Sequence, residues 1–429
     1  MSAARPLRMF PEISRESSLL ASKVVFVVLL FSSLFLQVKL PGLGYGVYNL
    51  LLPLCAVFLV ALNLGQCKET LRYHRQALFF LFLFYIWMWI SALFSDFQGI
   101  ALKYSLKYSI HFIILVSFLI LTYKKREPFS YYRWLLRFLM LLAVFGIVEY
   151  LFRDLWIFSL LRPPHSLAVY PRISSLMQWP NQLGVLMVIG VALGLLLRKE
   201  KSISTFEFSL ALFFFTIVIA LAGSRNSWLL LSVGVILAWL YRAMKLKMVF
   251  FILGLLGFWV LFFPVSTHQL GIRGCTVVPL EKHLREKSLK VVLEKLKSPA
   301  FFTLRETSTS RFVLWKAAMD EISKRAITGV GIEVFEKVIG KRILGDEGYH
   351  THNLFLNILV ELGIPGLLLF LIFIYSLLKR ADLYRPIIGI PLIMVFAAQM
   401  VDFFMHDFTF TSIGLYFLAE AGNSRHEDT

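Results

Sequence analysis

Long apolar stretches separated by short polar segments fill the sequence between Val24 and Leu418. About twelve such stretches occur, each near the roughly 20 residues that a helix needs to cross a bilayer. The pattern therefore predicts an all-α polytopic membrane protein with about 12 transmembrane helices and a helical segment outside the membrane. Four of the clearest stretches are Ala77–Phe94, Trp134–Phe152, Phe208–Ala222 and Met248–Phe263.

The composition agrees with this prediction. Hydrophobic residues make up 58% of the chain and the mean hydropathy is +0.73, above the roughly half-apolar composition of soluble domains. No small-residue cleavage pattern follows the first apolar stretch, so we expect the N-terminus to be retained. Cys55, Cys67 and Cys275 are assigned to a span, an inner loop and an outer loop, and we therefore expect no disulfide.

The formal net charge of +18 is distributed in a way that favours a membrane rather than nucleic acid. Loops rich in Lys and Arg alternate with loops poor in them, and rich loops face the cytoplasm. This alternation places both termini in the cytoplasm and the long segment 264–351 outside. The expected divisions are residues 1–263 with helices 1–9, residues 264–351 as a periplasmic helical loop, and residues 352–429 with helices 10–12 and a cytoplasmic tail. The basic loops lie at 5–23, 68–75, 124–133, 198–201, 242–247 and 379–385.

The outer segment 264–351 has the spacing of amphipathic helices. Apolar residues recur at helical intervals in Glu281–Lys297, and more regularly at Phe312, Trp315, Met319 and Ile322. Two interpretations remain open: a small lid packed on the membrane domain, or a surface helix that dips into the lipid headgroups.

Four basic residues stand out because this topology brings all of them to the outer surface: Arg172, Arg225, Arg311 and His352. Short outer loops are usually poor in Arg, so Arg225 in its tight turn invites a functional explanation. The planar guanidinium suits bidentate contact with phosphate, and several together are able to hold a pyrophosphate and stabilise it as a leaving group without a metal. The alternative for any single arginine is a contact with lipid headgroups.

His352 lies where the outer segment re-enters the membrane, ahead of an apolar run interrupted at 363–366. The interruption predicts a re-entrant or kinked helix. A histidine of near-neutral pKa is suited to removing a proton from an incoming hydroxyl, although a helix-capping role is equally compatible with the local sequence.

A metal site built from histidines is the less favoured alternative, because two histidines at i and i+2 do not share a helical face. It would use His350, His352, His406 and Asp407. Lesser candidates near the same surface are Glu149, Asp154 and Asp402, for which hydrogen bonding to an arginine is a sufficient reason. We therefore predict neither a metal nor a cofactor.

At these positions the sequence resembles the family of O-antigen ligases and O-antigen polymerases, membrane glycosyltransferases of the GT-C type. The most specific match is His352-Asn353, nine residues, Gly363, two residues and Gly366. Two departures are Ala326-Ile327, where the family usually has Pro and an apolar residue, and Asn226, where Gly is common. The weaker matches are Arg172 with Pro180-Asn181 and Gly184; Ser224-Arg225-Asn226-Ser227-Trp228; and Ser310-Arg311, Trp315, Ile327-Thr328-Gly329-Val330-Gly331 and Phe335.

The resemblance implies transfer of a glycan from undecaprenyl pyrophosphate to a sugar hydroxyl at the periplasmic face of the bacterial inner membrane, without metal. In ligases the acceptor is the lipid A–core. Carried over to this chain, Arg225 and Arg311 would hold the pyrophosphate, His352 would activate the hydroxyl, and Arg172 would support the anionic region. The remaining motif residues are expected to help bind substrate: Asn181, Ser224, Asn353, Gly363 and Gly366.

Two other functions compete with the ligase. An O-antigen or exopolysaccharide polymerase, or a protein O-oligosaccharide ligase, would use the same chemistry with another acceptor. A small-anion or lipid transporter would bind its substrate transiently through the same arginines, but it should carry polar groups deep in its spans, which are mostly uniformly apolar here.

Overall fold

The computed structural model describes residues 15–34, 48–123, 128–152, 173–177, 180–242, 245–262, 305–344, 349–379, 381–401 and 408–424. Within these ranges the regular structure is helical, which confirms the predicted all-α class. The helices are α1 (Arg15–Leu34), α2 (Tyr48–Leu62), α3 (Leu64–Tyr73), α4 (Arg75–Leu93), α5 (Gln98–Thr122), α6 (Pro128–Leu151), α8 (Pro180–Lys199), α9 (Thr205–Ala222), α10 (Arg225–Leu240), α11 (Leu246–Phe262), α15 (Arg305–Lys324), α16 (Lys341–Leu344), α17 (Leu354–Leu378), α18 (Pro386–Val401), α19 (Phe408–Asn423) and the π-helix η4 (Phe335–Gly340).

Six described helices are long and apolar enough to cross a membrane, and a seventh span results if α2 and α3, bent by 96°, count as one. Shorter apolar helices occur at Leu20–Leu30, Asn226–Leu240, Lys247–Trp259 and Pro386–Met400. The chain is therefore a polytopic membrane protein, while the predicted total of 12 spans remains a prediction.

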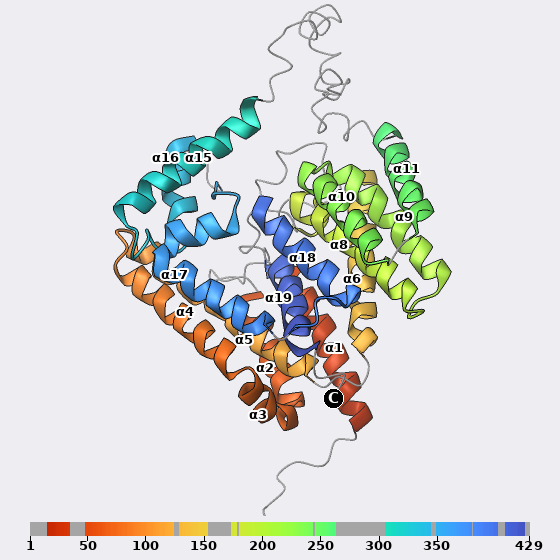
Figure 1. The fold of residues 1–429 in the computed structure, drawn as a ribbon, viewed down its shortest axis with the longest axis horizontal. Coiled ribbons are helices and arrows are strands. Elements are labelled where there is room, and N and C mark those ends of the chain that lie inside the picture. Colours follow the sequence, from red (N-terminus) through yellow and green to blue (C-terminus); the bar gives the residue numbers. More distant parts are fainter. Residues whose placement is uncertain are drawn as a thin grey trace, which may run out of the picture.

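The helices pack in two groups that α18 and α19 join (Figure 1). In one group, α17 lies along α4, and α5 contacts α2, α4 and α19. In the other, α8 is surrounded by α6, α9, α10 and α18, and 94% of its apolar 18-residue stretch is buried inside the protein. Glycines allow this close packing of α8, since a Cβ on Gly190 would lie 2.7 Å from the Phe215 ring.

Local sequence fixes where the helices of the second group begin and end. Ser204 caps α9 by accepting a hydrogen bond from the Glu207 amide at 3.0 Å. The helix ends at Gly223, whose φ of 54° is the left-handed conformation that glycine adopts without strain. Ser224 then caps α10 by accepting from the Ser227 amide. The tight turn between α9 and α10 therefore places Arg225 at the first position of α10.

The two ends of the bundle are defined by His352 and Asn423. At the Asn423 end, the Asn423 amide donates to Leu119 O at 2.9 Å and to Thr122 Oγ1 at 2.7 Å, and its Oδ1 lies 2.7 Å from His74 Nε2. These bonds join α19 to α5 and to the start of α4. They fix the helices at the end opposite the candidate site.

Outside the spans, α15 packs on α17 and η4 through a small second core. The predicted helix around Trp315 is confirmed. The side chains that are fully buried are Leu314 and Ala318, however, while Phe312 and Met319 are 66% and 57% exposed. The helix predicted at Glu281–Lys297 lies outside the described residues.

Candidate functional site

His352 is held in a strained backbone conformation at the head of α17. Its φ of 54° lies in the left-handed region, which non-glycine residues seldom occupy. Thr351 before it is fully buried and accepts a hydrogen bond at its carbonyl from Trp315 Nε1 at 2.7 Å. Asn353 after it caps α17 by accepting from the Leu356 amide at 3.0 Å. The residues on both sides of the histidine are thus held by hydrogen bonds, one from α15 and one within α17.

Arg311 lies close to the same segment because of its position on α15. It is four residues before Trp315, so the two side chains share one face of the helix, with Cβ atoms about 5–6 Å apart. Trp315 itself is bonded to Thr351, the residue before His352. The half-buried Arg311 therefore projects from the surface against which the histidine segment is fixed.

A second group of motif residues meets at the junction of α8 and α10. Asn181 is the second residue of α8, and Gly184 packs against α10 so tightly that a Cβ there would collide with Ser227 Oγ. Ser224 is fully buried and Arg225 begins α10. The structure thus brings the Pro-Asn-x-x-Gly segment and the Ser-Arg turn together.

Helix α18 connects this second group to His352. At one end of α10, Tyr241 Oη donates to Leu383 O, just before α18. Farther along, Gly234 packs on Met394, since a Cβ on Gly234 would lie 2.9 Å from Met394 Cε. The two helices therefore run in opposite directions, and Arg225 lies at the end of α18 that contains Met400. Met400 O accepts from Asn353 Nδ2 at 3.2 Å. Arg225 and His352 thus lie at the same end of the bundle.

Backbone groups at the kink in α17 form hydrogen bonds that fix the loop 326–331. Gly363 has φ 69° and ψ −174°, which breaks the helix as the sequence predicted. The Val330 amide donates to Val360 O at 3.0 Å and the Gly331 amide to Glu361 O at 2.9 Å, while the Ile364 amide donates to Ala326 O at 2.8 Å. Helix α4 joins the same network through the Trp87 and Ser91 side chains.

Motif glycines allow this close approach of the two backbones. A Cβ on Gly363 would collide with Ile327 O, one on Gly329 with Glu361 O, and one on Gly366 with the Leu362 side chain. The Gly-Val-Gly turn and the glycines after His352 are therefore parts of one interlocked support. Their predicted contact with substrate remains a prediction.

Three buried glutamates lie beneath this support: Glu333, Glu336 and Glu361. Tyr108 Oη donates a hydrogen bond to Glu333 Oε1. Burial raises the pKa of the Glu333 carboxyl to about 7, with repulsion from Glu336 adding to the rise and the Tyr108 bond opposing it. Lys337 Nζ donates to Glu336 Oε1 at 2.6 Å, and this pairing raises the pKa of Lys337 despite its partial burial. The sequence analysis missed this cluster.

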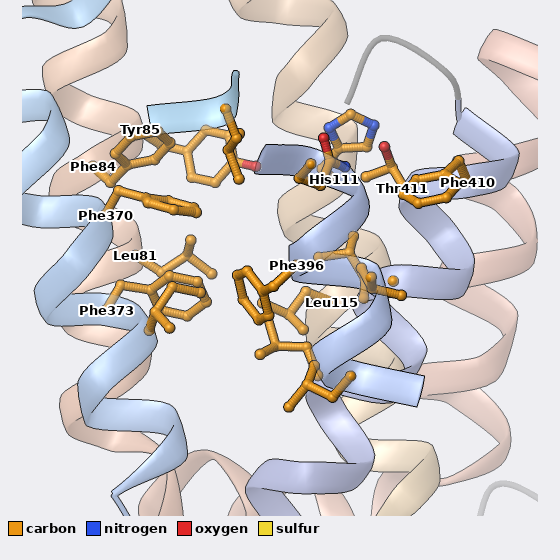
Figure 2. A pocket seen from close by; sticks show the side chains of 18 residues that line it. Leu81, Phe84, Tyr85, His111, Leu115, Phe370, Phe373, Phe396, Phe410 and Thr411 are labelled. Atoms are coloured by element: carbon orange, nitrogen blue, oxygen red, sulfur yellow. The ribbon is translucent and has the colours of Figure 1, made fainter. Parts of the chain in front are cut away.

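An apolar cavity, with about 90 Å³ of space for the centre of a water molecule, opens between the α4/α17 pair and the α18/α19 pair. Figure 2 shows Phe370 and Phe373 on one side facing Phe396 on the other, with His111 and Thr411 together at one end. Leu354, two residues after His352, also lines the cavity. The cavity therefore extends from the histidine segment into the apolar interior of the bundle.

Several predicted residues lie outside the described ranges. They are Arg172, Asp154, Asp402, His406, Asp407 and Cys275. For Arg225 the structure describes the backbone but not the side chain. Glu149 accepts hydrogen bonds from the backbone amides of Ser174 and Ser175, which gives this lesser candidate a structural role that we had not predicted. Among the described residues, no three His, Cys, Asp or Glu side chains are placed to share a metal ion. Cys55 and Cys67 are free.

The described residues thus define a polytopic helical membrane protein with a histidine segment, an arginine-bearing helix and an apolar cavity at one end. Residues 210–371 match the model of the family described as O-Antigen ligase. The matched stretch agrees with the resemblance drawn from the motifs. It includes Arg225, Arg311 and His352 but not Arg172. A comparison with curated proteins gave no match. The family implies a glycosyltransferase-like enzyme that acts on a lipid-linked glycan and an acceptor.

Proposed function

We propose that the protein is an O-antigen ligase at the periplasmic face of the bacterial inner membrane. It transfers a glycan from undecaprenyl pyrophosphate to a sugar hydroxyl of the lipid A–core. The observation that carries this proposal is the position of His352: it is held at φ 54° between α15 and α18, at the same end of the bundle as Arg225. Strained backbone of this kind is concentrated at functional sites.

The proposed reaction is a single displacement at the anomeric carbon. His352 takes the proton of the acceptor hydroxyl as its oxygen attacks, and the bond between the anomeric carbon and the pyrophosphate oxygen breaks. The electron pair leaves with the pyrophosphate, whose developing charge Arg225 and Arg311 stabilise, with Arg172 supporting the same region. No metal is needed for these steps.

The apolar cavity supports a lipid-linked donor. Its lining of aliphatic and aromatic side chains from α17, α18 and α19 suits the part of an isoprenoid chain nearest the pyrophosphate. Leu354 connects this lining to the His352 segment. A chain in the cavity would therefore present its pyrophosphate at the level of the histidine and of the α15 face that contains Arg311.

The test is a transfer assay with purified full-length protein, undecaprenyl pyrophosphate-linked glycan and no added metal. Separate reactions contain lipid A–core, a second lipid-linked glycan, or a protein acceptor. Product on the lipid A–core supports the ligase, whereas product only on another acceptor replaces it with a polymerase or a protein ligase. Absence of product with all three acceptors overturns the proposal.

Variants then test the site. We expect His352→Ala and Arg311→Ala to fold and to lose roughly a hundredfold or more in rate. Arg311→Lys keeps the charge but loses the bidentate fork, so it should recover only part of the activity. The matched control is Lys316→Ala, which removes an exposed cation from the same helix and should leave the rate unchanged. Wild-type activity in His352→Ala would remove the mechanism.

A further inference from the structure

His352 has a second imidazole and a carboxylate behind it. The His350 ring is buried, and its centroid lies 4.8 Å from that of His352. His350 Nδ1 also lies 3.8 Å from Glu336 Oε2, and Glu336 is itself only 6% exposed. The other oxygen of Glu336 accepts from Lys337. The four side chains therefore form a row that leads from the proposed base into the protein.

The backbone holds this row in place. Glu336 is the second residue of the π-helix η4, a form of helix that is rare and frequent at functional sites. The last residue of η4, Gly340, packs on the backbone of Tyr349, since a Cβ there would collide with Tyr349 O. Tyr349 directly precedes His350. The end of η4 and the start of the histidine segment are thus fixed against each other.

Charged groups of both signs surround the row. The carboxyls are Glu336 on η4, Glu333 before it and Glu361 on α17, all of them buried. The cations are Lys337 on η4, Lys107 on α5 and Arg311 on α15, and Tyr108 adds a hydrogen bond to Glu333. Lys337 already pairs with Glu336 and so weakens the attraction of the Glu336 carboxylate for a proton on His350. Glu336 Oε2 lies 3.8 Å from His350 Nδ1, and Glu361 also interacts electrostatically with His350.

We propose that Glu336 and His350 are positioning residues for His352: through His350, the Glu336 carboxylate orients the base and stabilises the positive charge that forms when it takes a proton. This inference rests on the proposed function for the role of His352. It predicts that removing the charge of Glu336 makes His352 harder to protonate. Removing the charge of Lys337, which pairs with Glu336, makes His352 easier to protonate.

The experiment measures the protonation of His352 directly, without substrate. Diethylpyrocarbonate modifies neutral imidazole, and fragment-level mass spectrometry of the full-length protein follows modification of His352 separately from His350 across pH 5–9. We expect the midpoint pH of His352 modification to fall by about half a unit to one unit in Glu336→Gln, and to rise by a similar amount in Lys337→Met. Glu420→Gln is the matched control, because Glu420 is 5% exposed but lies near the Asn423 end.

The rate gives a second readout. In Glu336→Gln the rate should fall by roughly tenfold or more and the acidic limb of its pH profile should move to lower pH, whereas Glu336→Asp should restore most of both. A purely structural role would lower the yield of folded protein and leave the midpoint unchanged. The inference is overturned if the midpoint pH of His352 modification does not change, or if it moves in the same direction in Glu336→Gln and in Lys337→Met. If Glu336→Gln does not fold, Lys337→Met alone decides by the sign of its shift. Full activity of His352→Ala would instead reject the proposed function.

Discussion

Replacing Gly363 by Ala tests whether the break in α17 supports the site. At φ 69° and ψ −174° the backbone lies in a region that is essentially restricted to glycine, so an alanine costs about 1–3 kcal/mol there. The added Cβ would also collide with the carbonyl oxygen of Ile327. No side-chain rotation relieves contact with a backbone atom, which adds about 1–3 kcal/mol of overpacking. The total destabilisation should lie between about 2 and 6 kcal/mol.

The measurement is thermal unfolding of purified Gly363→Ala in detergent, followed by tryptophan fluorescence, with the transfer rate measured on the folded fraction. We expect Tm to fall by about 5 °C or more and the rate to fall with it, because the loop 326–331 and the start of α17 separate. Gly257→Ala on α11 is the control, since a Cβ at Gly257 would meet nothing within 4 Å. Its Tm should be unchanged or higher. A Gly363→Ala protein with wild-type Tm and rate would refute the reasoning.

Three further predictions concern other parts of the fold. The pKa of the Glu333 carboxyl is about 7 in the folded protein, against an ordinary value of 4.5, so the folded state binds this proton more tightly than the unfolded state does. The stability that the bound proton contributes is complete below pH 4.5 and is lost as the pH rises to about 7. The Tm of wild type should therefore fall over this range relative to Glu333→Gln; parallel curves would contradict the assignment. Asn423→Ala removes buried hydrogen bonds at the far end and should lower the free energy of unfolding, measured with denaturant, by about 1–3 kcal/mol. The transfer rate per folded molecule should be unchanged, and a loss of that rate would show coupling between the two ends. Trp315→Phe loses the bond to Thr351 O and should lower the transfer rate by about three- to tenfold with little change in Tm; Trp89→Phe, a partly exposed residue of α4, should change neither.

Much of the architecture could be predicted from the sequence because membrane helices are specified locally. The apolar stretch Phe208–Ala222 falls within the observed α9, and the break at 363–366 appears as a kink in α17. The gathering of Arg225 and His352 at one end followed from counting spans and charged loops. Each of these inferences needs only the chemistry of neighbouring residues, which the sequence displays directly.

The supports of the site could not be predicted, because they depend on pairs of residues far apart in the chain. Tyr108 and Glu333 are separated by 225 positions, and Trp87 and Leu362 O by 275. A signal for Glu333 did exist: a carboxylate two residues after the Gly-Val-Gly turn, in an apolar setting. His350 was considered only as a metal ligand, and its contact with Glu336 depends on a π-helix that no periodicity indicates.

The bond between Asn353 and Met400 has a consequence for biosynthesis. A chain inserted from its N-terminus acquires Arg225 and then Arg311 well before α18 leaves the ribosome. Asn353, the residue after His352, gains its bond to α18 only when that helix, the penultimate one described, enters the membrane. Partly synthesised chains would therefore contain the arginines without a fixed histidine, and activity would first appear close to the completion of insertion.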